Sequence, residues 1–356
     1  MFTSSKLYNI NCINQEKYMH FTKFNLPAIL YSRPETALPQ RSAYGILGEP
    51  KEEKDLGRII TPEQYYKDCI NENWAVGGFI GYNMEIMQAS ARAAAKVKAP
   101  VLLQASCRVV DYAGAEMLRK MAEACADELE RDVVLHLDHG DSVERCKHCI
   151  DAGFRSVMLD NEHDDFETNV QKTKEVCDYA HKRGVFVEGE VFHPVPGPDR
   201  YETDVEEAVK YARLTGCDSL AVCCGNAHDL PNDYPKKLNV AKIAQIHGEL
   251  PDMPLVLHAT SILSNDFIES ANVFGMELEQ CCNFSLHELQ ESFKHGVCKV
   301  NSALDIKIVF TRAVREYMLR HPSHYDPRKY LGFARRTAED YIARKHINVF
   351  LDNNRV

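Results

Sequence analysis

Three histidines stand where short apolar runs of this sequence end. His139, His228 and His258 follow the runs VVLHL, LAVCC and PLVL, and Asp138 directly precedes the first of them. Three neutral imidazoles that leave a fourth position open form a catalytic zinc set, and a neighbouring carboxylate can carry a proton. If the three runs are strands that meet at one mouth, the sequence predicts metal-assisted chemistry at an oxygen-bearing carbon.

Composition narrows the class of protein. The chain has 356 residues, 45% of them hydrophobic, and a formal net charge of −10 with a pI near 5.9. This acidity argues against a nucleic-acid or anionic-membrane partner, although an anionic small molecule needs only local donors. The N-terminus lacks the apolar core of a signal peptide, and no run approaches the roughly 20 residues of a membrane span. We therefore expect a soluble, cytoplasmic protein.

The 13 cysteines do not indicate a disulfide framework, which is typical of much shorter chains. Cys146 and Cys149 make one CxxC pair, which suggests a metal or redox site. The pair lies in the helical stretch SVERCKHCIDAG, and no second CxxC accompanies it. We therefore interpret both cysteines as helix residues.

Short apolar runs alternate with amphipathic stretches from about residue 59 onward, which is typical of parallel strands joined by helical crossovers. Eight strands are expected, at 75–79, 101–105, 133–137, 156–159, 185–190, 219–224, 254–258 and 297–301. Eight units predict an α/β fold of the (β/α)8 TIM-barrel type. A doubly wound open sheet is the competing interpretation, but it gives no reason for polar residues at nearly every strand end.

Residues 1–58 differ from the rest, because they contain four prolines and no sustained period. We expect them to form an N-terminal extension to a barrel domain at 59–356. In a barrel, all strands direct their carboxyl ends to one mouth, where polar residues are typically catalytic. The expected strands end at Gln104 with Ser106, Asp138 with His139, Asp160, Glu190, Gly225 to His228, His258 and Asn301.

The motifs at these ends resemble those of class II, metal-dependent fructose-bisphosphate aldolases and their ketose-bisphosphate relatives. In the family's order they are HLDHG (136–140), GFRSVMLD (153–160), VEGE (187–190), GNAH (225–228), LVLH (255–258), KVN (299–301) and DPRKY (326–330). The resemblance extends from about residue 65 to 345. Several motifs at proper intervals make it specific.

The resemblance implies a metal centre and its surroundings. His139, His228 and His258 match the three metal ligands, and Asp138 matches the catalytic aspartate. Asp160 and Glu190 match carboxylates that serve a second or alternative cation position. The implied cofactor is one Zn²⁺ per subunit, with a second cation possible, and the implied assembly is a homodimer or homotetramer.

The resemblance also implies contacts with an anionic sugar substrate. Asn301 matches an asparagine beside the dihydroxyacetone part, Ser106 a serine near a phosphate, and Arg328 an arginine that reaches the distal phosphate. We add Ser261 and Gly225, in the loops after the seventh and sixth strands, to the candidate substrate-binding residues.

The chemistry agrees with these residue types. Retro-aldol cleavage leaves an enediolate, which Zn²⁺ stabilises as a Lewis acid. Cleavage also removes the proton of the C4 hydroxyl, a task for a carboxylate such as Asp138. A lysine Schiff base is the other route to such an electron sink, and no strand-end lysine among the motifs suggests it. We therefore predict a class II aldolase, an aldehyde-lyase of class EC 4.1.2.

Each residue also has a purely structural interpretation. His258 alone could be a satisfied core histidine, and Asp138 alone could cap the next helix. Glu190 could pair with a neighbouring lysine of the barrel. Their occurrence together, in order, at successive strand ends favours the site.

The sequence departs from the family where phosphate is bound. The family's HGGSG reads HATSI (258–262), its NxxTD reads NSALD (301–305), and its GxxHG ends in Asp229. Backbone amides approach phosphate most closely at glycines, and the threonine hydroxyl is replaced by Leu304. The fifth-strand loop offers only Asp199 or Glu202 for the family's proton-transfer glutamate, and the loop after the seventh strand is enlarged at residues 262–285.

The metal residues are therefore retained whereas the phosphate cradle is rebuilt. The first hypothesis is a metal aldolase that acts on a phosphorylated ketose or related sugar acid and cleaves fructose 1,6-bisphosphate poorly. The alternatives are another zinc-dependent activity on the same fold, such as an epimerase or hydrolase, and a catalytically silent metal-binding barrel.

Overall fold

The computed structural model describes residues 57–356 apart from 162, 193–201, 227–236, 259–261 and 280–283. The predicted N-terminal extension therefore lies outside the described residues, except for its last two.

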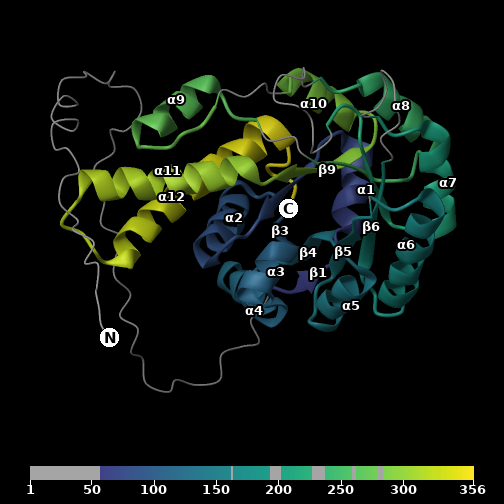
Figure 1. Cartoon of the computed structure of the whole chain (residues 1–356), viewed down its shortest axis with the longest axis horizontal. Coiled ribbons are helices and arrows are strands. Elements are labelled where there is room, and N and C mark those ends of the chain that lie inside the picture. Colours follow the sequence, from purple (N-terminus) through teal and green to yellow (C-terminus); the bar gives the residue numbers. More distant parts are fainter. Residues whose placement is uncertain (1–56, 162, 193–201, 227–236, 259–261, 280–283) are drawn as a thin grey trace, which may run out of the picture. The chain divides into compact units, whose positions relative to one another are not determined.

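Eight parallel strands form the centre of the fold (Figure 1). They are β2 (Val76–Ile80), β3 (Leu102–Ser106), β4 (Val133–Gly140), β5 (Ser156–Leu159), β6 (Phe186–Val191), β7 (Ser219–Val222), β8 (Leu255–Leu257) and β9 (Val297–Ser302). Each strand pairs with its successor, and β9 pairs with β2. The sheet is therefore closed. The (β/α)8 barrel is confirmed, and the open sheet is excluded because it would leave two unpaired edges.

One further strand was not predicted. β1 (Ile59–Ile60) pairs in parallel with Val133 and Val134 at the start of β4, ahead of the residues that β4 pairs with β5. Two residues are too few to show an alternating pattern in a sequence. β1 can pair there because the first residues of β4 precede its pairing with β5, so the edge of β4 that faces β5 is available to another strand.

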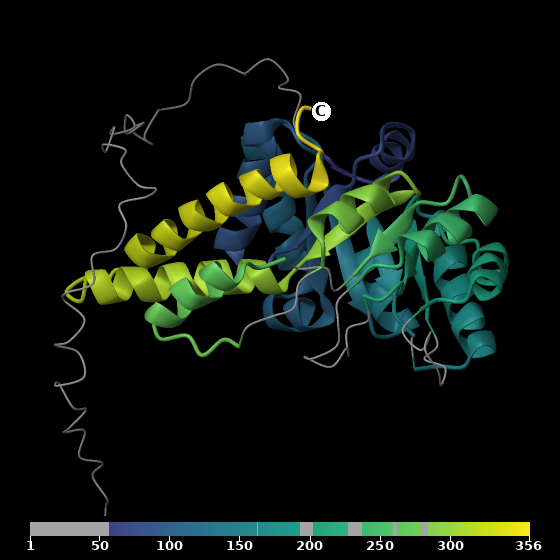
Figure 2. The ribbon, with the colours of Figure 1, turned by 90° about the horizontal axis from the view of Figure 1, so that it is seen from above.

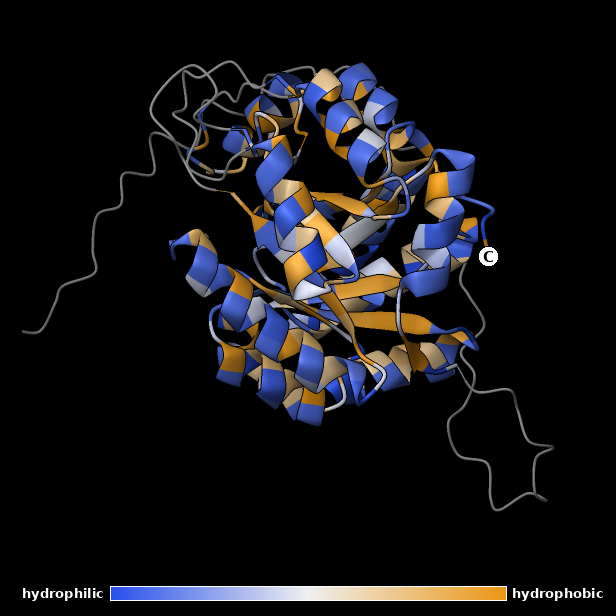
Figure 3. Ribbon diagram, turned by 90° about the vertical axis from the view of Figure 1, so that its right-hand side faces the viewer, coloured by the Kyte–Doolittle hydropathy of each residue, from blue (hydrophilic) through white to orange (hydrophobic). Residues whose placement is uncertain are grey.

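Helices surround the barrel. They are α1 (Glu63–Glu72), α2 (Met84–Val97), α3 (Cys107–Ala113), α4 (Ala115–Leu129), α5 (Val143–Asp151), α6 (Phe166–His181), α7 (Val205–Thr215), α8 (Val240–Glu249), α9 (Asn265–Val273), α10 (Leu286–Phe293), α11 (Leu304–Arg320) and α12 (Pro327–Lys345), with a π-helical turn at His346–Phe350. Several starts are encoded locally, since the side chains of Asn83, Ser142 and Asp165 each accept a hydrogen bond from a backbone N–H of the first turn. Figure 3 shows the strands inside this layer, whose helices carry many hydrophilic residues.

The segment between β8 and β9 contains α9 and α10, and the predicted enlarged loop at 262–285 includes α9 and ends directly before α10. Leu263, Ile268 and Ala271 of this segment pack against Ile308 of α11. α11 and α12 form a long hairpin whose junction lies away from the strands in both views (Figures 1 and 2). None of the described helices is long and apolar enough to cross a membrane.

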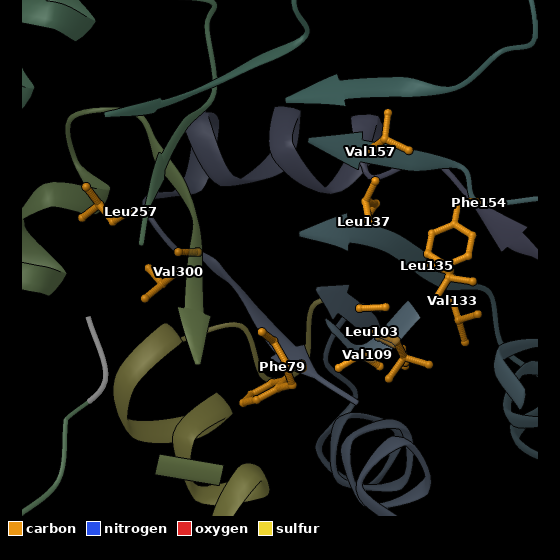
Figure 4. Packing of buried hydrophobic residues seen from close by; sticks show 14 of the residues in the cluster. Phe79, Leu103, Val109, Val133, Leu135, Leu137, Phe154, Val157, Leu257 and Val300 are labelled. Atoms are coloured by element: carbon orange, nitrogen blue, oxygen red, sulfur yellow. The ribbon is translucent and has the colours of Figure 1, made fainter. Parts of the chain in front are cut away.

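The main core lies between the strands and the helices. Val133, Leu135 and Leu137 of β4 belong to this layer, beside residues such as Leu103 and Phe154 (Figure 4). Successive side chains of a strand point to opposite faces. The intervening residues of β4 therefore face the interior of the barrel, and this parity decides which side chains reach the site.

Candidate active site

Asp138 is held at the inner face of the barrel by amides from two other strands. Its Oδ1 accepts hydrogen bonds from Gln104 Nε2 and from Asn301 Nδ2, both at 2.8 Å, and the carboxylate is only 3% exposed. Gln104 Nε2 also lies 3.2 Å from Asn301 Oδ1, so the three side chains form one network. Sequence reasoning noted Gln104 only as a polar strand-end residue. Its place two residues before Ser106, on the same strand face, was the available signal.

Asp138 and His139 are consecutive, yet both belong to one candidate cation cluster. Regular strand alternation would send them to opposite faces. The pairing of β4 with β5 shifts register between Leu137 and Gly140, and His139 has a φ of +49°. Such a left-handed conformation of a non-glycine residue costs of order 1–3 kcal/mol and is typical of functional sites. This bulge directs His139 to the mouth beside Asp138.

Gly140 makes the bulge possible. A Cβ at this position would lie 2.4 Å from the carbonyl oxygen of Met158 in β5, which is closer than Cβ atoms in proteins come to non-bonded atoms. The glycine of the HLDHG motif therefore permits the backbones of β4 and β5 to approach closely. This approach allows the bulge that directs His139 to the site.

The histidines and carboxylates of neighbouring strands converge around His139. Its Nδ1 lies 2.6 Å from Asp160 Oδ2 and 3.9 Å from Glu190 Oε2, and its ring centroid lies 4.6 Å from that of His258. One ligand atom from each of Asp138, His139 and His258 lies within 4.8 Å of the others, and the same holds for His139, Asp160 and Glu190. Imidazole and carboxylate groups at this spacing suit a divalent cation such as zinc.

The electrostatics of the cluster also favour a cation. Burial by itself lowers the pKa of His139, but the charge of Asp138 and the hydrogen bond to Asp160 raise it to about 10. Without a metal, the cluster thus retains a proton at neutral pH. A divalent cation would supply the same positive charge to the same carboxylates.

Two predicted residues, His228 and Ser261, lie outside the described residues. The chain can be followed to Asn226, whose Nδ2 donates to the carbonyl oxygen of His258 at 3.1 Å and whose Oδ1 accepts from the N–H of Cys224 at 2.7 Å. The ends of β7 and β8 are therefore tied together two residues before His228.

Gly225 has a backbone role. It adopts a φ of +88°, and a Cβ there would lie 2.2 Å from the carbonyl oxygen of Lys237. This explains the glycine without any substrate.

Among the predicted substrate-binding residues, Ser106 and Asn301 lie at the mouth. Ser106 is the register partner of Asp138 in the pairing of β3 with β4, and Asn301 bonds directly to Asp138. Arg328 is not brought to them. It lies at the start of α12, its side chain is 90% exposed, and it pairs with Asp326 at 2.8 Å.

The structural interpretations of single residues can now be judged. The helix after β4 is capped by Ser142, whose Oγ accepts from the N–H of Arg145, so Asp138 is not a helix cap. A barrel lysine, Lys299, does pair with a glutamate of β6, but with Glu188. Cys146 and Cys149 are buried in α5, as expected for helix residues.

Fold and site together define a (β/α)8 barrel whose mouth holds a histidine–carboxylate cluster. Residues 61–355 match the family described as fructose-bisphosphate aldolase class-II. The fructose-bisphosphate aldolase of Thermus caldophilus is 34% identical over 299 residues, which cover 80% of this chain and 95% of the relative. That of Giardia intestinalis is 34% identical over 284 residues, which cover 77% and 87%. The chain belongs to the class II fructose-bisphosphate aldolase family.

Solved structures agree on the fold. The YdjI aldolase from Escherichia coli K12 superposes with a TM-score of 0.68 at 23% identity, covering 83% of this chain and 99% of that one. The fructose-bisphosphate aldolase of Campylobacter jejuni gives a TM-score of 0.67 at 19% identity, covering 84% and 97%. At these identities the likeness concerns the architecture alone.

Proposed function

We propose that this protein is a metal-dependent aldolase, an aldehyde-lyase that cleaves or forms a carbon–carbon bond in a phosphorylated ketose or related sugar acid. One observation carries the proposal. A buried carboxylate, Asp138, is held by two amides beside His139 and His258, in a chain whose family is that of class II aldolases.

His139, His228 and His258 would hold one Zn²⁺, with Asp160 and Glu190 near a second or alternative cation position. The donor set fits, because imidazole and carboxylate are zinc ligands and the carboxylates already attract positive charge to His139. When bound, the ion supplies Lewis acidity toward the substrate's carbonyl and hydroxyl oxygens.

The chain's own residues move and hold the proton. Asp138 would accept the proton of the hydroxyl at C4 during cleavage and return it during condensation. Gln104 and Asn301 donate to its Oδ1, so they orient the carboxylate and leave Oδ2 as its second acceptor oxygen.

The eighth-strand motif supports an altered substrate. Ser302 Oγ donates to Asp305 Oδ1 at 2.8 Å and accepts from Lys345 Nζ at 2.9 Å, so this hydroxyl is engaged within the fold. Leu304, at the family's threonine position, is 49% exposed, and its side chain has no hydrogen-bonding group. Loss of one charge-assisted hydrogen bond to a phosphate costs roughly 1.5–3 kcal/mol. We therefore infer that fructose 1,6-bisphosphate is a poor substrate.

A cleavage screen of the zinc-reconstituted full-length chain tests the proposal. The panel contains fructose 1,6-bisphosphate, other sugar phosphates, sugar acids and ketoses without phosphate, and aldehyde release is the readout. We expect turnover of at least one anionic member, and a kcat/KM for fructose 1,6-bisphosphate below about 10⁴ M⁻¹s⁻¹, the low end for ordinary enzymes. A higher kcat/KM would refute the inferred loss of hydrogen-bond donors to the substrate's phosphate.

Proton exchange distinguishes the remaining alternatives. Exchange at the carbon next to the carbonyl of a dihydroxyacetone derivative requires the metal and a base but no aldehyde partner. Zinc-dependent exchange without cleavage would favour an epimerase. A metal-loaded protein with neither activity would be the silent barrel and would contradict the proposal.

A further inference from the structure

A second polar cluster lies inside the barrel and has no part in the site described so far. Lys299 of β9, Glu188 of β6 and His136 of β4 are each at most 1% exposed. They occupy the inward positions two residues before Asn301, Glu190 and Asp138, respectively. The cluster therefore forms the layer of side chains directly beneath the candidate metal site.

Hydrogen bonds connect this layer to one candidate ligand. Lys299 Nζ donates to Glu188 Oε2 at 2.7 Å, and the other oxygen, Glu188 Oε1, lies 2.9 Å from His258 Nε2. Because an ionised carboxylate only accepts hydrogen bonds, the proton in this second contact belongs to His258 Nε2. The lone pair of the imidazole then lies on Nδ1, which is 3.7 Å from Glu190 Oε1 and faces the candidate site.

The direction of the whole chain of hydrogen bonds follows from Lys299. An ammonium group has three donors and no acceptor, so every polar partner of Nζ must accept from it. His136 Nε2 lies 3.1 Å from Nζ and must be the acceptor nitrogen, and His136 Nδ1 then donates to Ser156 Oγ at 2.7 Å. Burial and the charge of Lys299 hold the pKa of His136 well below its usual range, which agrees with a neutral ring.

We propose that Glu188 and Lys299 are positioning residues, which fix His258 in its Nε2–H tautomer and so present Nδ1 to the divalent cation. This inference rests on the proposed metal role of His258. Metal-binding histidines commonly donate their second N–H to a carboxylate, and loss of that carboxylate typically weakens metal binding about 10–100-fold.

A purely structural ion pair is the alternative, and the chain contains a matched control. Lys345 and Asp305 form a second buried ion pair, which also bonds to Ser302 and Tyr341. The Lys345 ammonium contacts Asp305, Ser302 and the rings of Tyr341 and Phe350, and none of these is a candidate metal ligand. Removing either lysine should destabilise the protein, but only the removal of Lys299 should change the affinity for the metal.

The decisive variant is Glu188→Gln. With Lys299 in place, the amide must turn its oxygen to the ammonium and its NH₂ toward His258, and this opposes the Nε2–H tautomer. The double variant Glu188→Gln/Lys299→Met releases the amide, whose oxygen can again accept from His258. We therefore expect the single variant to bind metal about 10–100-fold more weakly than the wild type, and the double variant to recover most of this loss.

The measurement is Zn²⁺ and Co²⁺ affinity of the full chain by competition with a chelator, alongside thermal unfolding. Lys345→Met should lower the unfolding temperature and leave the metal affinity unchanged. Wild-type affinity in Glu188→Gln, or a double variant no better than the single one, would overturn the proposal. If Glu188→Gln does not fold, the ¹⁵N shifts of His258 in the metal-free wild type decide instead, since protonation at Nδ1 would overturn the proposal equally.

His258→Ala separates this inference from the proposed function. Full metal occupancy in that variant would remove His258 from the ligand set and refute the premise. Loss of metal in His258→Ala, together with unchanged binding in Glu188→Gln, would leave the proposed function intact and refute only the positioning role.

Discussion

The variant Asp138→Asn tests the proton carrier with little disturbance of the fold. An asparagine at this position can keep its Oδ1 as acceptor for the amides of Gln104 and Asn301, which now lie at 2.8 Å. A hydrogen bond to a charged acceptor is worth about 1.5–3 kcal/mol and one to a neutral acceptor about 0.5–1.5. Two bonds therefore lose about 2 kcal/mol together, partly offset because a neutral amide is easier to bury than a carboxylate.

The catalytic loss should be much larger than the loss of stability. A positioned general acid–base group contributes about 10²–10⁴-fold, or roughly 2.7–5.4 kcal/mol of transition-state stabilisation. We expect kcat for carbon–carbon cleavage to fall by this factor while metal content stays near wild type. The assay is aldehyde release from the best substrate of the screen, with metal content measured on the same preparation.

A matched control removes a buried carboxylate elsewhere. Asp352 bonds to His346 and to the N–H of Gly77, outside the described site, so Asp352→Asn should reduce stability without a specific effect on kcat. If Asp138→Asn retains cleavage within a few-fold of wild type and keeps its metal, Asp138 is not the proton carrier. Glu190 would then be the next candidate.

Four further predictions rest on the same geometry. His258→Ala should lose most of the bound metal, measured by elemental analysis after dialysis, and full occupancy would disprove the ligand assignment. Because the pKa of His139 is raised to about 10, zinc uptake by the metal-free protein at pH 8 should release about one proton from that ring, measured by calorimetry in buffers of different ionisation enthalpy. The raised pKa also means that the contribution of His139 to the stability of the metal-free protein is full below pH 6.5 and is lost as pH rises toward 10. Gly225→Ala should lower the unfolding temperature more than Gly184→Ala, because both residues have positive φ but only at Gly225 would the added Cβ meet a backbone oxygen, at 2.2 Å. Equal effects would contradict the steric argument.

Much of the architecture could be predicted from the sequence because its causes are local. Each barrel strand is a short apolar run between amphipathic helices, and all eight begin and end within three residues of their predicted positions. Asp138, Asp160 and Glu190 were predicted at strand ends, and the pairing of β4 with β5 and of β5 with β6 brings their strands together. The Cys146 and Cys149 pair was correctly interpreted as helical.

Other features depend on contacts between distant segments. His136, Glu188 and Lys299 were not singled out, although each lies two residues before a predicted site residue and therefore on the same strand face. The alternation of side chains along each strand was a usable signal for these three residues. Their hydrogen-bond partners could not be known, because Lys299 meets Glu188 only when the barrel closes. The role of Arg328 stays a prediction, since its motif predicted a substrate contact and the structure shows only an exposed side chain at the start of α12.

The sequence by itself determined the barrel, the order of its strands and the polar residues that end them, because these follow from apolar runs, helix periodicity and capping side chains. Only the tertiary structure decided how the consecutive residues Asp138 and His139 both reach the mouth, since this needs a bulge against β5 that Gly140 permits. It also decided that the hydroxyl of Ser302 is engaged by Asp305 and Lys345. These contacts depend on which backbone segments approach one another. The distances between the segments are set by the closed barrel rather than by any local sequence pattern.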